Sequence, residues 1–544
     1  MNAAAAQLWR SRWPWLIPFV LALATAAAYA NSLAATFIFD DYALVVDDLR
    51  LRGLATALSA STRPLTRLTF HLHYWAAGAF KAADMRAVNI LIHLAAGLRL
   101  YGVVRRTLRV PRLAATYGAA ADGLAGAIAA VWLLHPLQTE SVTYVMQRAE
   151  SLMGMLFFLS LYSYARGLQS AVGHRWHTLA IVAAAFCMAS KPVAVTLPVI
   201  VLLYGRAFAA GTLRESLRRR WSFHVGMAAT WLVLLTILCK PNESTTSTGL
   251  GGGLPTPLQY FWTQQQVVLH YLRLALWPQG LCLDYAWPPV RHWTEALLPA
   301  MVLLPLFGLA LWALVRNRPA GFAGMWFFIN LAPTSSFLPV ADGAFEHRMY
   351  LPLAGLIALA VCGAYRVLAV RSGTVALVAL GLAVAATLGV QTARRNADYR
   401  TELTMWADVV SKRPENLRAR NDLAVALSAT GNADEAIAQY LQVLRRIPAA
   451  ERRRLDAGEV VERGLVPADS YSYHYFRAHV NLGWLQFSVR HQPEAAAANL
   501  IAGLRVIPYH EQGRHMLKDV LRAQGVAENE LDAELQRRLE AGGR

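Results

Sequence analysis

Repeated runs of about 20 mostly apolar residues constrain this chain more than any other feature. They begin near Trp15, Ala87, Gly123, Leu152, Thr178, Val193, Ser222, Glu295, Gly321, Pro352 and Thr374. Only helices and closed barrels satisfy their backbone hydrogen bonds inside a bilayer, and runs of this length are typical of helices. The charged fraction is 16%, against about a quarter in soluble proteins. The sequence therefore predicts an all-α, polytopic transmembrane bundle of about 11 spans.

Two of these spans share one apolar stretch, residues 178–204. Lys191 and Pro192 interrupt it, and proline cannot continue a helix because it lacks a backbone N–H and clashes with the preceding turn. We therefore expect two helices joined by a tight turn at Lys191.

Basic residues gather in alternate loops, which sets the expected orientation. These loops contain 17 basic residues against Asp122 and Glu215. The basic residues are Arg10, Arg12, Arg105, Arg106, Arg109, Arg112, Arg166, Arg175, Arg206, Arg214, Arg218, Arg219, Arg220, Arg316, Arg318, Arg366 and Arg371. The positive-inside rule predicts a cytoplasmic N-terminus, and an odd number of spans places residues after Gln391 outside. The stretch "AYANSL" resembles a signal-peptide cleavage site, but we favour an uncleaved first helix.

The net charge of +18 lies mainly in the membrane part of the chain. Residues 394–544 hold 22 Lys and Arg against 20 Asp and Glu. The high isoelectric point therefore follows from membrane orientation, and no nucleic-acid partner is expected. The four cysteines form no CxxC motif, so the sequence predicts neither a disulfide framework nor a cysteine metal site.

The last 150 residues show a helical repeat. Pro414 and Pro448 are 34 residues apart, the period of a tetratricopeptide repeat. The residues that match the repeat are Leu423, Ala424, Leu427, Gly431, Ala436 and Tyr440, then Leu482, Gly483, Ala495, Ile507 and Pro508 in a second copy after an insertion at about 449–475. We predict a membrane domain at 1–393 and an external repeat domain at 394–544 that grips a protein partner; a generic array of helical hairpins is the alternative.

Two adjacent carboxylates, Asp40 and Asp41, follow the first span in "FIFDDY". Neighbouring carboxylates repel and partial burial raises their pKa, so either could act as a general base near neutral pH. A divalent cation, Mg²⁺ or Mn²⁺, held by Asp41 with Glu140 remains open, as does a plain helix-end cap. Asp47 and Asp48 are interpreted as a solvated loop.

A second acidic cluster lies in "HPLQTESVTYVMQRAES". A helix from about Gln138 would place Glu140, Thr143, Tyr144 and Gln147 on one face, with Glu150 beside it. Glu140 and Glu150 are candidate catalytic acids, and Arg148 is expected to pair with a carboxylate. The alternative is a polar cap on a re-entrant turn.

Cations on the same predicted side are candidates for binding a phosphate. His347 and Arg348 precede the tenth span, which suits a phosphate at the lipid interface. Lys191 either binds an anion or snorkels to the interface. Arg63 is a further candidate, with Arg67, His71 and His73 near it. Because no nucleotide-binding motif occurs, a lipid-anchored phosphate substrate is expected, with its tail among the membrane lipids.

Seven motifs occur in order along the chain: "FIFDDYALVVDD", "RPLTRLTFHLHYW", "NILIHL", "HPLQTESVTYVMQRAE", "SKPVAVTLPVIVLLYG", "YLRLALWPQGLCLDY" and "EHRMYLP". Together they resemble the transmembrane-and-tetratricopeptide-repeat O-mannosyltransferases and their bacterial relatives. That family lies in the GT-C superfamily of glycosyltransferases, which use polyprenyl-phosphate sugars. The resemblance covers nearly the whole chain, including the repeats.

The resemblance implies roles for particular residues. An essential acid in the first external loop corresponds to Asp40 and Asp41, and a further acid in the second loop corresponds to Glu140 or Glu150. Basic residues that bind the donor phosphate correspond to Arg348 with His347, followed by Lys191 and Arg63. The repeat tail is shorter than in animal relatives, which leaves the acceptor open.

The expected function is transfer of a sugar, such as mannose, from a polyprenyl-phosphate donor to a hydroxyl of an exported protein. The expected location is a bacterial inner membrane with the repeats in the periplasm. Two alternatives stay open: the same chemistry on a lipid or surface glycan, and a non-catalytic membrane scaffold or flippase.

Overall fold

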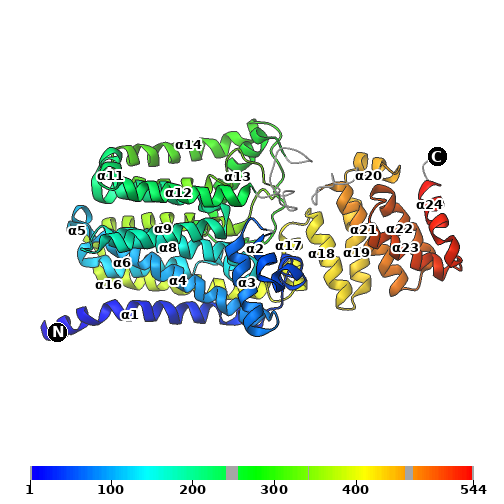
Figure 1. Ribbon diagram of the computed structural model, residues 1–544, viewed down its shortest axis with the longest axis horizontal. Helices are drawn as coiled ribbons and strands as arrows, with labels where there is room; N and C mark the ends of the chain where they lie inside the picture. The colour runs from blue at the N-terminus through cyan, green and yellow to red at the C-terminus, as the bar shows by residue number, and fades with distance from the viewer. Residues whose placement is uncertain (1–2, 60, 240–254, 341, 460–469, 542–544) are drawn as a thin grey trace.

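The computed structural model describes residues 3–59, 61–239, 255–340, 342–459 and 470–541, and of residues 3–14 and 369–378 the backbone alone. Every regular element in this part is helical, and it contains no β-strand. A bundle of long helices is followed by a stack of shorter ones that leads to the C-terminus (Figure 1). The all-α prediction is confirmed.

Six helical segments in the described part are long and apolar enough to cross a membrane. They are Trp15–Ala34, Ala82–Leu108, Pro111–Leu133, Pro192–Ala210, Trp221–Leu238 and Thr294–Val315. The other long helices of the bundle are α8 (Arg148–Gly167), α9 (Gly173–Ser190), α13 (Pro257–Leu276), α15 (Pro319–Leu331) and α16 (Pro352–Asp398). The polytopic bundle is thereby confirmed, whereas the count of 11 spans stays a prediction.

The 47-residue helix α16 folds back on itself. A straight helix of this length would measure about 70 Å. Trp132 Nε1 nevertheless donates to the Tyr350 carbonyl just before α16 begins, 2.9 Å away. Thr392 Oγ1, near its end, donates to the Leu134 carbonyl at 2.7 Å. Both ends of α16 therefore lie at the same end of α6 (Ala121–Leu133), and the spans predicted from Pro352 and Thr374 occupy two antiparallel arms.

The basic loops meet at one end of the bundle, as their alternation predicts. Arg112 donates to the carbonyls of Ala207 and Asn317, and Arg206 donates to that of Leu314. Arg105 and Arg109 pair with Asp122. We call this the basic end; it lies on the left in Figure 1, with the chain's N-terminus. The side chains of Arg10, Arg12 and Arg371 lie outside the described residues.

One helix of the bundle has no counterpart in the sequence analysis. Helix α13 (Pro257–Leu276) begins with a capping box at Thr256 and Gln259. Its side chains bond along the loop after α15: Tyr260 Oη donates to the Thr334 carbonyl, and Tyr271 Oη donates to that of Phe345. Both contacts lie at the end opposite the basic loops. The helix escaped prediction because polar residues, among them the consecutive Gln264, Gln265 and Gln266, interrupt its apolar residues.

The apolar stretch 178–204 divides as predicted. Helix α9 ends at Ser190, Lys191 is extended, and Pro192 opens a short 3₁₀ turn before α10 (Leu197–Gly205). At the end of the bundle where Lys191 lies, opposite the basic end, α2 (Leu54–Ser59) and α3 (Pro64–Ala77) cover the helices. Asp48 there is buried and pairs with Arg67 at 2.7 Å. The prediction of a solvated loop is therefore wrong for Asp48, although Asp47 is exposed.

The tail is a series of helices that pack as hairpins. These are α17 (Glu402–Lys412), α18 (Leu417–Ala429), α19 (Ala433–Arg446), α20 (Ala449–Asp456), α21 (Tyr471–Ser488), α22 (Pro493–Val506), α23 (Glu511–Ala523) and α24 (Leu531–Glu540). The residues of the first predicted repeat lie on the hairpin of α18 and α19. Ala424 of α18 and Ala436 of α19 are fully buried. In the second hairpin Gly483 packs against Ala496 rather than Ala495. Residues 460–469 of the predicted insertion lie outside the described residues.

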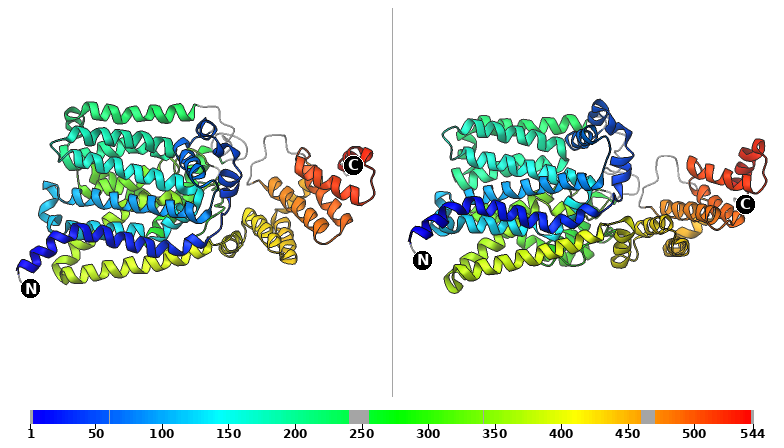
Figure 2. Two further views of the ribbon diagram at one scale, coloured as in Figure 1. Left: turned by 60° about the horizontal axis from the view of Figure 1, so that its bottom comes forward. Right: turned by 90° about the horizontal axis from the view of Figure 1, so that it is seen from below.

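The bundle's apolar core does not stop at the predicted domain boundary. Residue 393 falls inside α16, and Trp406, Val409 and Leu423 of the tail belong to the same buried cluster as the bundle helices. A second apolar cluster starts with Leu417 and continues to Leu535. The two cores therefore meet at α18, so α17 is structurally a part of the bundle. The later tail helices, orange to red in Figure 2, stand as a separate stack beyond the bundle.

Candidate functional site

The loops at the end opposite the basic loops carry the candidate residues, and Asp41 is the most firmly held of them. Its carboxylate is completely buried and accepts backbone N–H bonds from Ile38 at 3.2 Å and from Met146 at 2.7 Å. Burial raises the pKa of Asp41 to about 7. Because both oxygens are occupied, this side chain ties the first loop to the second.

The residue before the acid pair has a strained backbone. Phe39 has a φ of 49°, in the left-handed region that non-glycine residues rarely adopt. Two contacts from α17 hold it there: its N–H donates to Glu402 at 3.2 Å, and its ring meets Trp406 edge-on at 5.4 Å. The tail therefore supports the turn that presents Asp40.

Asp40 is placed differently from Asp41. It is only partly buried, and its backbone N–H donates to Tyr144 Oη at 3.2 Å. Burial raises the pKa of its carboxyl, while Tyr144, Arg418 and Arg63 counteract this. A partly exposed carboxylate with a raised pKa meets the requirements of a general base.

The second acidic segment is broken where one helix was expected. Helix α7 (Thr139–Thr143) ends at Tyr144, whose ψ of 115° is extended, and α8 begins only at Arg148. The break frees the Met146 N–H for Asp41. The prediction of a continuous helix from Gln138 is therefore wrong, because a contact with a distant loop replaces a helical hydrogen bond.

Arg148 does not pair with a carboxylate, contrary to expectation. Its Nε donates to Asn89 Oδ1 at 2.7 Å, its Nη2 to the Met85 carbonyl at 2.9 Å, and its guanidinium lies over the Phe70 ring. Arg148 thus fastens the start of α8 to α4 (Ala82–Leu108).

Arg86 was missed by the sequence analysis, and it is central to the site. It is completely buried, and its guanidinium donates to the carbonyls of Ala35, Thr36 and Thr143, the last at 2.8 Å. One side chain thus joins the segment before Asp40 to the end of α7. A buried arginine in a span was the available signal, because such charges are expensive and therefore functional.

Glu140 and His347 form a buried pair between the second and the last of these loops. His347 donates its backbone N–H to Glu140 Oε2 at 2.9 Å, and its Nδ1 lies 2.6 Å from Oε1. Burial raises the pKa of Glu140 to about 8 and holds that of His347 well below its usual value. At neutral pH the imidazole is therefore uncharged, and two hydrogen bonds join the pair, one from the backbone N–H and one at Nδ1.

Glu150 and Lys191 form a second buried pair. Lys191 Nζ lies 2.5 Å from Glu150 Oε2, and both side chains are less than a tenth exposed. Burial lowers the pKa of Lys191, and the nearby Glu150 opposes that shift. Lys191 therefore points inward toward the carboxylates, which excludes the snorkelling alternative.

Arg63 is the cation of the cluster that keeps its guanidinium free. It is partly exposed and caps the start of α3. Glu150 and Asp40 are the charges that act on it most, and among the described residues its guanidinium has no hydrogen bond or ion pair. Arg67 and His71, by contrast, bond to Asp48 and to the Leu51 carbonyl and so hold the loop before α3. His73 makes no described hydrogen bond.

Arg348 is buried close to these groups but is already engaged. Its guanidinium donates to the carbonyls of Asp342, Gly343 and Thr334, the second at 3.0 Å. It thereby shapes the loop before the first arm of α16. Of the predicted phosphate-binding residues, Arg348 is thus engaged by backbone carbonyls and Lys191 by Glu150, whereas Arg63 keeps its guanidinium free.

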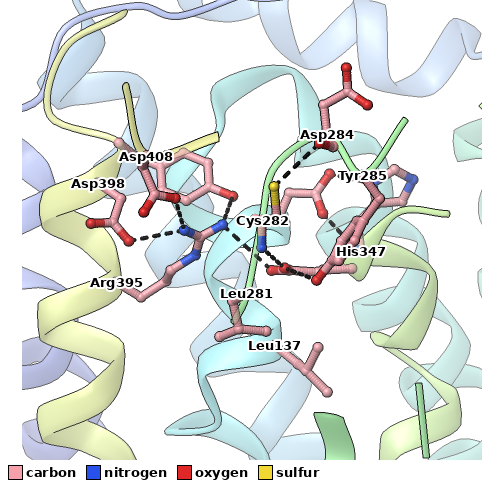
Figure 3. A network of polar contacts seen from close by, with 12 residues as sticks. Leu137, Leu281, Cys282, Asp284, Tyr285, His347, Arg395, Asp398 and Asp408 are labelled. Atoms are coloured by element: carbon pink, nitrogen blue, oxygen red, sulfur yellow. Dashed lines mark hydrogen bonds and ion pairs between the residues drawn. The ribbon is translucent and has the colours of Figure 1, made fainter. Parts of the chain in front are cut away.

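A further network joins this loop to the tail. Glu346 is completely buried and accepts from Tyr285 Oη at 2.7 Å and from the Cys282 N–H. Burial raises its pKa to about 7. Arg395 lies 3.8 Å from Glu346 and pairs with Asp398 and Asp408 at 2.9 Å each (Figure 3). The network fixes α17 to the loop that follows α13.

A divalent cation on Asp41 and Glu140 stays a prediction. Each oxygen of these two carboxylates already takes part in one hydrogen bond, to Ile38, Met146 or His347. Within the described part of the chain no three His, Cys, Asp or Glu side chains gather as metal ligands. No chemical step is therefore assigned to a metal here.

Known proteins with similar sequences share a descriptive name. Mouse protein O-mannosyl-transferase TMTC4 is 25% identical over 502 aligned residues, covering 78% of this chain and 66% of that protein. Drosophila melanogaster protein O-mannosyl-transferase Tmtc3 is 25% identical over 518 residues, covering 78% and 54%. Human TMTC3, named in the same way, is 24% identical over 477 residues, covering 76% and 50%. The chain thus spans half to two thirds of the length of these relatives. No protein-family model and no solved structure matches it.

Proposed function

Because the chain belongs to the TMTC-like family of membrane proteins, we propose that it is a glycosyltransferase that acts on proteins. The sugar is a hexose, for which mannose is the first candidate because the relatives are named mannosyl-transferases. The donor is a polyprenyl-phosphate sugar and the acceptor is a Ser or Thr hydroxyl.

One observation carries the proposal: the partly buried Asp40 carboxylate and the guanidinium of Arg63, which has no hydrogen bond or ion pair among the described residues, lie near enough for each charge to act on the other. Glu150 with Lys191 and Glu140 with His347 lie beside them. A carboxylate base beside cations is what transfer of a sugar from a phosphate requires, because a proton must be removed and a phosphate charge must be neutralised.

In the proposed reaction Asp40 removes the proton from the acceptor hydroxyl. The acceptor oxygen then attacks the anomeric carbon, and the bond from that carbon to the phosphate oxygen breaks through an oxocarbenium-like transition state. The polyprenyl phosphate leaves with the bonding electrons, and Arg63 and Lys191 stabilise its negative charge. A single displacement inverts the anomeric centre, and the proton remains on Asp40.

Asp41 and Arg86 act as positioning residues in this scheme. Asp41 has both oxygens occupied by backbone N–H groups, and Arg86 holds the segment before the pair. Both side chains are completely buried and so do not face a substrate, but both fix where Asp40 lies.

The basic end is proposed to face the cytoplasm, which places Asp40 on the opposite side of the membrane. This fits a lipid-linked donor, which needs no nucleotide-binding motif. The Arg-rich and Ala-rich composition suits a bacterium, so we propose an inner-membrane protein with the tail in the periplasm. The helices after α17 would then bring the acceptor protein to the site.

The test is transfer from polyprenyl-phosphate mannose to a Ser/Thr-containing peptide, measured as released polyprenyl phosphate and as glycopeptide. Asp40→Asn is expected to lower the rate by about 10²–10⁴-fold, the usual contribution of a general base. Asp47→Asn is the matched control, since Asp47 is an exposed acid of the same loop. Full activity of Asp40→Asn would refute the assigned base. Folded protein that releases no carrier from any polyprenyl-phosphate sugar would favour the scaffold or flippase, and release onto lipid or glycan alone would change the acceptor.

A further inference from the structure

A cavity of about 480 Å³ lies between α4, α8 and α9 near the basic end of the bundle. Its size is within the range of small-molecule sites. The three helices lie side by side, with α8 between the other two (Figure 1). Gly102 of α4 lies on its wall, and Arg86 at the candidate active site is 16 residues away, about 24 Å along the helix. The cavity is therefore separate from that site.

Three partly buried arginines line the cavity without a carboxylate partner. Arg166 lies with its guanidinium 4.0 Å from the centre of the Trp176 ring and donates to Tyr162 Oη at 3.3 Å. Arg106 lies 5.3 Å from the centre of the Tyr162 ring and donates to Gln169 at 2.9 Å. Arg99 makes no hydrogen bond or ion pair among the described residues.

Two further basic residues have a carboxylate partner, and one of them, Arg105, also lines the cavity. Arg105 and Arg109 share Asp122 as their ionic partner. Asp122 is thus taken up by Arg105 and Arg109. Arg99, Arg106 and Arg166, which line the same cavity, have no carboxylate partner among the described residues. Three concentrated positive charges, two of them held over aromatic rings, form an anion site, and planar guanidinium groups match phosphate oxygens in particular.

The inner part of the cavity is apolar. Leu98, Leu159 and Leu179 line it, and they lie within the helices α4, α8 and α9 rather than in the loops. Gly102 shapes this wall, because a Cβ at that position would lie 2.6 Å from the Tyr162 ring. Gly102 therefore lets the Tyr162 ring lie directly on the backbone of α4, and both residues line the cavity.

We propose that this cavity binds an anionic lipid from the leaflet at the basic end. The lipid phosphate lies among Arg99, Arg106 and Arg166, and the first part of an acyl chain lies along Leu98, Leu159 and Leu179. A free phosphate ion would use the arginines but not the apolar wall. The combination of both therefore identifies a tailed phosphate as the ligand.

The test compares lipids on the full-length protein purified in a neutral detergent. Phosphatidylglycerol and phosphatidylcholine are titrated separately, and bound lipid is counted by native mass spectrometry; inorganic phosphate is added in a third arm. Wild-type protein is expected to retain one phosphatidylglycerol in preference to phosphatidylcholine. Arg99→Gln with Arg166→Gln is expected to weaken that binding by about tenfold or more, because charge-assisted hydrogen bonds are lost.

Arg316→Gln is the matched control, since Arg316 is an exposed arginine at the same end that does not line the cavity. It is expected to leave lipid binding unchanged. Equal retention of the two lipids, an unchanged double variant, or an equal loss in Arg316→Gln would each overturn the proposal. Displacement of the lipid by millimolar inorganic phosphate would also overturn it, because the acyl chain would then contribute nothing. The readout is binding alone, so its failure is distinct from failure of the proposed transferase.

Discussion

Replacement of Arg86 by lysine tests how the site is held together. Arg86 donates to three buried carbonyls, those of Ala35, Thr36 and Thr143. A lysine keeps the charge but has no planar fork, so it can satisfy about one of the three. Each hydrogen bond from a charged donor contributes about 1.5–3 kcal/mol, so the loss of two predicts a destabilisation of about 3–6 kcal/mol.

The same change should lower activity more than it lowers substrate binding. The carbonyls of Ala35 and Thr36 precede the turn that carries Asp40, so releasing them lets the carboxylate shift. A misplacement of about 1 Å can lower the rate about 100-fold. The measurements are thermal unfolding in detergent and the transfer rate of the folded fraction, at saturating donor.

Arg109→Lys is the control for this experiment. Arg109 also belongs to α4's end, but its pair with Asp122 is exposed, and such pairs contribute about 0–1 kcal/mol. If the Arg86→Lys protein matched wild type in both unfolding and transfer, the conclusion that the Arg86 side chain fixes Asp40 and Asp41 would be refuted.

Three further outcomes follow from the buried pairs and from the tail. Lys191→Met should destabilise the folded protein by about 3–5 kcal/mol, because Glu150 is left buried and unpaired. Adding Glu150→Gln to this variant should restore stability but not donor affinity. Recovered affinity in the double variant would mean that Lys191 does not bind the phosphate. Glu402→Gln should reduce transfer with little change in melting temperature, because it weakens the contact that holds Phe39; unchanged kinetics would show that α17 does not support the turn. The stability contributed by Glu140 and Glu346 should fall as pH rises from about 5 to 8, because folding raises the pKa of Glu140 to about 8 and that of Glu346 to about 7, so the folded state holds protons that the unfolded chain releases near 4.3. Buried histidines such as His347, whose pKa folding lowers, act in the opposite direction below about 6.5, so the test compares variants. Melts of Glu140→Gln should lose less stability over this range than those of wild type, and an equal slope would contradict the assignment.

Much of the fold could be predicted because it depends on local pattern. Apolar runs of span length, the prolines at helix starts and the segregation of Arg to alternate loops are visible in the sequence. The turn at Lys191 followed from Pro192, whose effect on a helix is local. The same reasoning failed at α13, where no continuous apolar run marks the helix, and at the break after Thr143, which depends on Asp41 about 100 residues earlier.

The sequence determined which residue types the site contains, because isolated carboxylates and cations at the ends of apolar helices are few. The tertiary structure alone decided their partners: Glu140 with His347, Glu150 with Lys191, and Asp41 with two backbone N–H groups. It also separated the engaged Arg348 from the free Arg63, and it showed that Arg86 and α17 support the acid pair. These pairings join residues far apart in the chain, so they depend on how the helices pack and leave no periodic signal.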